Sequence, residues 1–200
     1  VMGSCGEVTL LSQTERIEII NRVADMARGR IPVFFGTTMA TTKDTVELSR
    51  RAEQQGATGV VLLVPPYVNP PQEAVYEHFL KVAEAVSCTV ALYNNPARVQ
   101  VHLDPETIIR LNRAASNISI DKEAMADSSQ IAEVLYGTNH RMRVVCCDSP
   151  QYGLIPSVLA LGGSGTANVT GNVAPAEVAA ISQPRDGQGD LRSWRRAYGE

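Results

Sequence analysis

Short apolar runs alternate along this chain with longer segments in which apolar residues recur every three or four positions. The short runs are rich in valine and isoleucine and are too short to form core helices. We therefore expect strands that are buried on both faces. The predicted strands are Ile31–Gly36, Gly59–Val64, Thr89–Tyr93, Asn117–Ile120, Val144–Cys147 and Gly165–Val169.

The longer segments have the period of amphipathic helices, and several carry residues that begin or end a helix. Ser12 and Glu15 match a capping box, Gly29 suits a helix stop, and Asp104 precedes a proline and an acid. The predicted helices are Ser12–Arg28, Thr42–Gln55, Gln72–Val86, Asp104–Ala114, Ser128–Tyr136 and Tyr152–Leu161. A strand and then a helix recur roughly every 20 to 30 residues, which predicts an α/β fold with a parallel sheet.

Two architectures fit this alternation, an open doubly wound sheet and a TIM (β/α)8 barrel of which the chain holds a part. Polar residues directly follow each predicted strand, as in Gly36-Thr37-Thr38 and Lys122-Glu123. A barrel gathers all such strand ends at one mouth, whereas an open sheet uses mainly those beside its switch point. Neither GxGxxG after the first strand nor GxxxxGK[ST] occurs. The sequence favours the barrel.

The glycine-rich stretch Gly162–Gly165 is the main signal for a different site. Its backbone amides could form a phosphate cradle before the last predicted strand. A tight turn between a helix and a strand is the more common reason for such a stretch, because glycine adopts turn conformations without steric cost.

Composition and charge narrow the class of protein. Hydrophobic residues make up 44% of the 200 residues and charged residues 20%, which excludes a disordered or collagen-like chain. The formal net charge is −3 and the basic residues are scattered, so we expect no nucleic-acid partner. The longest apolar stretch, residues 59–66, is far shorter than the roughly 20 residues of a membrane span, and we expect no membrane partner.

Cysteine usage points to a reducing compartment. The four cysteines are irregularly spaced with no CxxC motif, and two of them are adjacent within an apolar run. We expect reduced, buried thiols and, because no export signal is visible at the N-terminus, a cytoplasmic protein. The cysteines are Cys5, Cys88, Cys146 and Cys147.

The histidines and serines give little support to metal or serine chemistry. His78, His102 and His140 are isolated, and no HxH, HExxH or Cys/His spacing supplies three metal ligands. No GxSxG motif is present, which disfavours a serine nucleophile. We expect neither a metal nor another cofactor.

Lysine is more informative, because the chain has only Lys43, Lys81 and Lys122. Lys43 and Lys81 fall on predicted helix surfaces, whereas Lys122 follows a predicted buried strand. Partial burial favours the neutral amine, which can attack a carbonyl and form a Schiff base. The alternative is an ion pair with Asp121 or Glu123. Strand neighbours point to opposite faces, so neither acid easily reaches the ammonium group, and the nucleophile is favoured.

Five motifs occur in the order and spacing of a known family. They are Gly3-Ser4-Cys5-Gly6-Glu7, Pro65-Pro66-Tyr67-Val68-Asn69-Pro70, Tyr93-Asn94-Asn95-Pro96-Ala97-Arg98, residues 117–124 (NISIDKEA) and residues 162–165 with 172–175. From Gly3 to about Ser182 the chain resembles the dihydrodipicolinate synthase / N-acetylneuraminate lyase family. That resemblance implies a TIM-barrel class I aldolase that binds pyruvate or a related 2-oxo acid as a lysine imine, without a cofactor.

The resemblance also implies roles for single residues. Lys122 matches the imine-forming lysine, and Tyr93 matches the tyrosine that relays protons. Ser4 matches a hydroxyl of the relay, and Tyr67 matches the relay tyrosine that a neighbouring subunit contributes.

Three further residues match positions that bind substrate in the family. Cys5 lies beside the amides that hold the pyruvate carboxylate, Arg98 matches the arginine that binds the carboxylate of the aldehyde, and the Ala167 carbonyl would face the pyruvyl group.

Several residues depart from the family pattern. Cys5 replaces a threonine hydroxyl, Val68 an aromatic residue, and Cys147 a glycine that would leave room for the second substrate. Asp121 occupies a position that is normally apolar and would face the helices. These changes affect the identity of the aldehyde more than the lysine chemistry.

The family's first strand and most of its second precede the Gly3 turn, so we expect a barrel that is incomplete in this chain. Residues 1–182 would form the partial barrel, and residues 183–200 a loop and the start of a C-terminal helical region. By resemblance the whole protein would be a homo-oligomer, a dimer of dimers.

The predicted function is a lyase that condenses pyruvate with an aldehyde, with aspartate semialdehyde as the best candidate. The alternatives are another 2-oxo-acid aldolase or a sugar-acid dehydratase of the same family, a phosphate-binding barrel, and a non-catalytic barrel.

Overall fold

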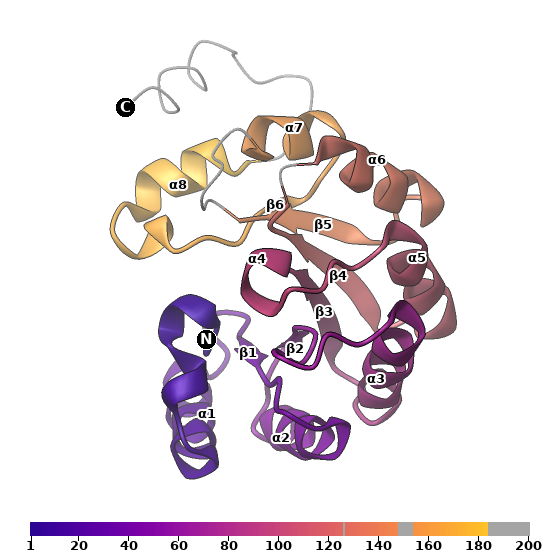
Figure 1. Ribbon diagram of the computed structural model, residues 1–200. Helices are drawn as coiled ribbons and strands as arrows, with labels where there is room; N and C mark the ends of the chain where they lie inside the picture. Colours follow the sequence, from indigo (N-terminus) through magenta and orange to yellow (C-terminus); the bar gives the residue numbers. More distant parts are fainter. Residues whose placement is uncertain (126, 148–153, 184–200) are drawn as a thin grey trace. The chain divides into compact units, whose positions relative to one another are not determined.

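The computed structural model describes residues 1–125, 127–147 and 154–183, and the chain divides into two compact units, Val1–Ile120 and Asp121–Glu200 (Figure 1). Within these residues, six strands follow one another in chain order in the sheet. The strand β4 (Ile118–Glu123) contains the boundary between the units. This α/β order is the one that the sequence predicts.

The first unit is built on three parallel strands, β1 (Phe34–Gly36), β2 (Gly59–Leu62) and β3 (Thr89–Asn94). Phe35 pairs with Val60 and Val60 with Val90, so these side chains share one face of the sheet. The helices of this unit are α1 (Gln13–Ala27), α2 (Thr42–Gln54), α3 (Gln72–Glu84), the short α4 (Pro96–Val99) and α5 (Pro105–Ala114), with 3-10 turns η1 (Ser4–Gly6) and η2 (Val8–Leu10).

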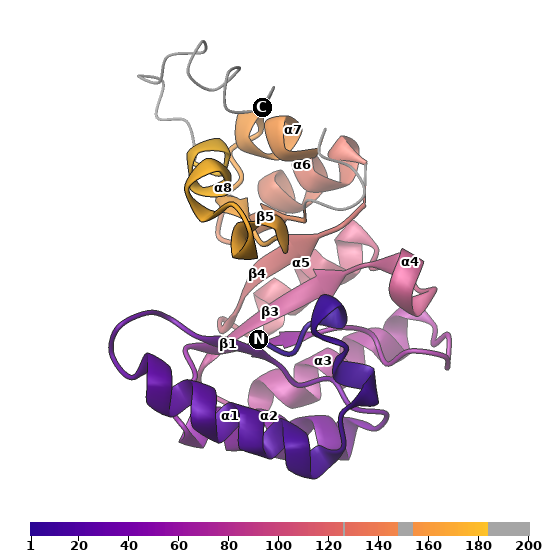
Figure 2. The ribbon, with the colours of Figure 1, turned by 90° about the vertical axis from the view of Figure 1, so that its left-hand side faces the viewer.

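The core of the first unit lies between the strands and the helices that cover them. Helix α2 packs against α1 and α3, and α3 packs against α5 (Figures 1 and 2). Each helix contributes an apolar stripe, and burial of such side chains, worth about 1.5–3 kcal/mol each, drives the packing. Fully buried members are Ile20, Phe35, Leu62, Phe79, Leu92, Leu103, Ile108 and Leu111.

The second unit continues the same pattern with β5 (Arg143–Cys146) and β6 (Gly165–Thr166), which pair in parallel. The amide of Cys147 donates to the carbonyl of Glu123 over 2.9 Å, which connects β5 to the end of β4. Helices α6 (Ser128–Gly137) and α7 (Leu154–Ala160) pack on β5 and on each other, and η3 (Thr170–Asn172) packs against α8 (Pro175–Ile181).

The predicted helix ends are largely confirmed. The Ser12 hydroxyl accepts from the Glu15 amide while the Glu15 carboxylate accepts from the Ser12 amide, and Gly29 has a φ of 69°. Asp104 is the N-cap residue of α5, but its side chain makes no capping hydrogen bond. The carboxylate instead lies 3.8 Å from the His102 ring nitrogen.

Strand lengths differ from the prediction. β1 begins at Phe34 because the Val33 amide bonds to the Thr58 hydroxyl, and β2 ends at Leu62 because the Leu63 amide bonds to the Thr38 hydroxyl. β4 is longer than predicted and runs to Glu123.

Among the strands, the last one predicted, Gly165–Val169, retains the smallest share of its predicted length. β6 has two residues, and its chain then turns where Asn168 bonds to Thr166 and to the Gly171 amide. The predicted helix from Tyr152 and the predicted C-terminal segment fall partly outside the described residues, which exclude 152, 153 and 184–200.

The Gly162–Gly165 stretch is a turn that packs tightly. A Cβ on Gly163 would lie 2.2 Å from Val158 Cγ1, so only glycine fits beneath α7. The amides of Gly162, Gly163 and Ser164 donate to backbone carbonyls within the unit. Because these three amides already have acceptors, the stretch lacks the open donors of a phosphate cradle.

Candidate active site

Lys122 is part of β4 and not of the loop that follows it. The side chain is half-buried, and its neighbours Asp121 and Glu123 are both fully buried. This alternation fits the rule that successive strand residues face opposite sides. The Asp121 oxygens accept no hydrogen bond in the described structure, so the alternative pairing of Lys122 with Asp121 is not formed.

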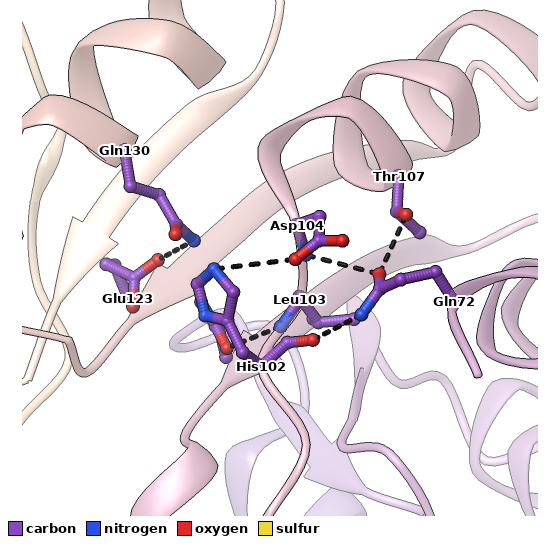
Figure 3. A network of polar contacts seen from close by, with 8 residues as sticks. Gln72, His102, Leu103, Asp104, Thr107, Glu123 and Gln130 are labelled. Carbon is purple, nitrogen blue, oxygen red and sulfur yellow. Dashed lines mark hydrogen bonds and ion pairs between the residues drawn. The ribbon is translucent and has the colours of Figure 1, made fainter. Parts of the chain in front are cut away.

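The two buried carboxyl groups beside Lys122 are held differently. Glu123 accepts from the Met125 amide at 2.7 Å and from the Gln130 side chain at 2.9 Å, a contact drawn in Figure 3. Asp121 has no such donor, and burial together with the nearby Glu123 charge raises the pKa of Asp121 well above its ordinary value. Asp121 therefore keeps its proton where an exposed aspartate would be ionised.

The ends of β5 and β6 bring two further predicted residues into register with β4. The Ala167 amide donates to the Cys146 carbonyl over 2.8 Å, just as the Cys147 amide donates to Glu123. Cys147 is buried and Ala167 is half-buried. The strand end that carries Lys122 thus continues through Cys147 to Ala167.

In the first unit, Tyr93 lies near the end of β3 and is only 5% exposed. Its phenol oxygen accepts a hydrogen bond from the Asn95 side-chain nitrogen at 2.8 Å. Arg98 lies on α4, is exposed, and its amide donates to the Asn95 carbonyl at 2.9 Å. The structure therefore brings Tyr93 and the turn that carries Arg98 together through Asn95.

Ser4 and Cys5 lie in the 3-10 turn η1, where Ser4 is half-buried and Cys5 exposed. The exposed Cys5 and the half-buried Cys88 correct the expectation that all four cysteines are buried. None of the four cysteines forms a disulfide. Burial, together with the nearby Glu53 carboxylate, raises the pKa of the Cys88 thiol to about 11.

The segment that carries this turn is attached to β1. The Gly36 amide donates to the Val1 carbonyl at 2.9 Å, and the Val1 nitrogen donates to the Phe34 carbonyl at 2.8 Å. A Cβ on Gly36 would lie 2.2 Å from the Met2 carbonyl oxygen. Glycine at position 36 therefore permits the close approach that places η1 at the end of β1.

Arg16 supports the segment around the η1 turn, a role that sequence reasoning missed. It is 8% exposed on α1 and donates to the carbonyls of Val8, Leu11 and Thr38 at 2.7–3.1 Å, and to the Met39 sulfur at 2.9 Å. Desolvation lowers the pKa of Arg16. Its guanidinium group ties the segment after η1 to the loop after β1, and no local motif indicates this role.

Tyr67 follows β2 and is 95% exposed, with Val68 beside it 61% exposed. Its φ of 81° lies in the left-handed region, which a bulky aromatic residue rarely adopts. An aromatic side chain held in this conformation and directed to solvent is typical of a residue that meets another molecule.

A partly buried network of side-chain amides supports the loop after β3 (Figure 3). The Asn94 side-chain oxygen Oδ1 accepts from the Leu103 amide at 3.1 Å. Gln72 donates to the His102 carbonyl and accepts from the Asp104 amide and the Thr107 hydroxyl. Asn94 of the predicted motif is thus structural, and Gln72 joins the start of α3 to the start of α5.

Among the described residues, no group of three or more His, Cys, Asp or Glu side chains could hold a metal ion. Within the same residues, no helix has the length and apolar character that crossing a membrane requires.

The fold and these side chains define a class of protein. It comprises α/β proteins that carry polar and reactive side chains at the carboxyl ends of parallel strands. The family model of the dihydrodipicolinate synthetase family matches residues 1–192, and the chain belongs to this family. A 4-hydroxy-tetrahydrodipicolinate synthase from Sorangium cellulosum is 38% identical over 196 residues, covering 98% of this chain and 64% of the relative.

Solved structures agree with this assignment. The dihydrodipicolinate synthase of Aquifex aeolicus superposes with a TM-score of 0.92 at 32% identity. The match covers 100% of this chain and 67% of the Aquifex chain. A chloride-inhibited dihydrodipicolinate synthase from Acinetobacter baumannii, complexed with pyruvate, superposes with a TM-score of 0.87 at 30% identity. That match covers 99% of this chain and 66% of the Acinetobacter chain. The chain spans about two thirds of the length of these relatives.

Proposed function

We propose that the protein is a Schiff-base-forming lyase that condenses pyruvate with an aldehyde, as a 4-hydroxy-tetrahydrodipicolinate synthase does with aspartate semialdehyde. The observation that carries the proposal is the half-buried Lys122 on β4, in a chain of the dihydrodipicolinate synthetase family. The names of the relatives and the pyruvate bound by one of them support the substrate class.

The chemistry begins when the neutral Lys122 amine attacks the keto carbon of pyruvate and a C–N bond forms. The substrate oxygen takes up protons and leaves as water, which gives a protonated imine. Loss of a proton from the adjacent methyl carbon yields an enamine. That carbon then attacks the aldehyde, whose oxygen becomes a hydroxyl group after protonation.

Tyr93 and Ser4 carry the protons of these steps in our proposal, with Tyr67 supplied by a neighbouring subunit. The η1 turn with Cys5 holds the pyruvate carboxylate, and the Ala167 carbonyl faces the pyruvyl group. Arg98 is exposed on α4, where its planar guanidinium can bind the carboxylate of the aldehyde in a bidentate manner.

Membership of the family also suggests the fold and the oligomeric state of the whole protein. We propose a TIM (β/α)8 barrel, of which residues 1–182 form a part, in a cytoplasmic dimer of dimers. Another 2-oxo-acid aldolase or a sugar-acid dehydratase would use the same lysine with a different partner. The phosphate-binding alternative loses support because the amides of Gly162, Gly163 and Ser164 already have acceptors.

Borohydride trapping tests the lysine directly. Purified protein reduced in the presence of pyruvate should gain one reduced pyruvyl group, and peptide mapping should place it on Lys122. Lys43 and Lys81 are exposed on helices and not on a strand end, so we expect neither to carry the label. The matched control variants are Lys43→Arg and Lys81→Arg, which should trap pyruvate like the parent, whereas Lys122→Arg should not.

The substrate question is answered in the same assay. Trapping with pyruvate and turnover with aspartate semialdehyde are expected together. Trapping without that turnover favours the other aldolases or the dehydratase. No trapping with any 2-oxo acid, or label on Lys43 or Lys81, refutes the mechanism and leaves a non-catalytic barrel.

A further inference from the structure

Asn95 occupies the N-cap position of α4 but does not use its side chain there. Asparagine is among the preferred N-cap residues because its side-chain oxygen accepts a helix amide. In this helix no such bond forms, and the Arg98 and Val99 amides donate to the Asn95 main-chain carbonyl at 2.9 and 3.2 Å. The side chain instead turns to Tyr93, and its nitrogen lies 2.8 Å from the phenol oxygen.

This contact has a definite effect on the phenol. A hydrogen bond donated to an oxygen stabilises the charged form of that oxygen more than the neutral form. Tyr93 is 5% exposed, so little solvent is present to stabilise a phenolate. The Asn95 amide therefore supplies stabilisation that water would give to an exposed tyrosine.

We propose that Asn95 is a positioning residue that stabilises the phenolate form of Tyr93 during proton transfer, an inference that rests on the proposed function. When the amine adds to the ketone, the phenol O–H bond breaks and its proton passes to the alkoxide oxygen of the adduct. The phenolate then takes a proton from the ammonium nitrogen of the same adduct. The step balances without any further reactant, and Asn95 donates to the phenolate throughout.

Asn95 also fixes where the phenol lies relative to the aldehyde-binding turn. Its carbonyl accepts the amides of Arg98 and Val99, and its side chain holds the Tyr93 oxygen. The short helix ends at Val99 and is capped by Gln100, whose φ is 62° and whose amide donates to the Pro96 carbonyl. One residue thus contacts both the Tyr93 phenol oxygen and the start of the turn that carries Arg98.

The decisive variant is Asn95→Asp. Aspartate has the same size and is an equally good N-cap residue, so α4 should form, but the donor is replaced by a carboxylate oxygen. We expect imine formation with pyruvate to slow about tenfold to a hundredfold, the range for loss of a hydrogen bond to a charged group. The limb of the pH–rate profile that reports Tyr93 should move to higher pH, because a neighbouring negative charge disfavours the phenolate.

Asn95→Leu provides a second variant, which removes the donor without adding charge. It should slow imine formation by about tenfold, with a smaller shift of the pH profile than Asn95→Asp. The final extent of borohydride trapping at long times should equal that of the parent, because the amine is unchanged. Thermal unfolding of each variant measures any loss of the fold separately.

A double-mutant cycle with Tyr93→Phe separates this role from a structural one. Without a phenol oxygen, Asn95→Asp and Asn95→Leu should change the rate less than about twofold. Equal slowing in the parent and the Tyr93→Phe background, or an unshifted pH profile, overturns the inference while the lysine mechanism stands. Absence of trapping in the parent protein refutes the proposed function itself.

Discussion

Asp121 shows how one residue can couple stability to pH. It is fully buried, its oxygens accept no hydrogen bond in the described structure, and its pKa is raised by burial and then by Glu123. In the unfolded chain its carboxyl group ionises at a pKa of about 3.9. The folded protein therefore holds this proton more tightly than the unfolded chain does.

The sign of the pH dependence follows from linkage. A raised folded-state pKa contributes stability that is fully present below the unfolded pKa and is lost as pH rises towards the folded value. Asp121→Asn removes the ionisation at almost constant volume. We expect its melting temperature to match the parent near pH 4 and to exceed it at pH 8, as measured by calorimetry.

Asp25→Asn is the matched control, because the Asp25 side chain is 65% exposed on α1. It should change the melting temperature little at either pH. A gain for Asp121→Asn that is the same at pH 4 and pH 8 would show that ionisation of this residue does not limit stability.

At the scale of elements, Arg16 joins segments that share no regular hydrogen-bond ladder. It bonds to Val8 after η1, to Leu11 before α1, and to Thr38 after β1. Without the guanidinium the Leu11 and Thr38 carbonyls would lose the donor that it supplies, whereas the Val8 carbonyl would keep the Leu11 amide. An unpaired buried polar group costs about 1–3 kcal/mol. The position of the Ser4–Cys5 turn therefore depends on a helix residue outside the turn.

Arg16→Met keeps the length and apolar stem of the side chain and removes the donors. We expect the free energy of unfolding to fall by about 2–4 kcal/mol in urea denaturation, from loss of several bonds to a charged group. The KM for pyruvate should rise, because the η1 turn is less well held. The control Arg22→Met, whose side chain is 76% exposed, should change stability by less than about 0.5 kcal/mol.

At the scale of the whole molecule, the loop after β2 presents the features of an assembly surface. Tyr67 and Val68 are both exposed, and Tyr67 is held at a φ of 81°. Aromatic side chains are enriched at protein interfaces because they bury a large area and still offer a polar atom. We propose that this loop contacts a second copy of the chain.

Tyr67→Asp should weaken self-association at least tenfold in sedimentation equilibrium, because it places a charge in an apolar contact. Tyr67→Phe should preserve association and lower turnover, since only the hydroxyl is lost. Tyr136 is 65% exposed on α6 and provides the control, because Tyr136→Asp should leave association unchanged. Association that is insensitive to Tyr67→Asp would place the interface elsewhere.

The sequence by itself predicted the order of strands and helices, the Ser12 capping box, the Gly29 helix stop and the family. These features depend on local periodicity and on motifs that lie within a few residues, so a linear reading can detect them. Lys122 also stands out in a linear reading, because it is one of only three lysines and follows an apolar run, and its role as the nucleophile is a proposal.

Only the tertiary structure decided the contacts between distant segments. The Arg16 bonds to Thr38, the fit of Gly36 against Met2 and the Gln72 network join residues more than 20 positions apart. The bond from Asn95 to Tyr93 spans two residues, yet it depends on a side chain that does not cap its helix. Periodicity reports which face of an element is buried, whereas the partner of each polar atom is fixed by packing in three dimensions.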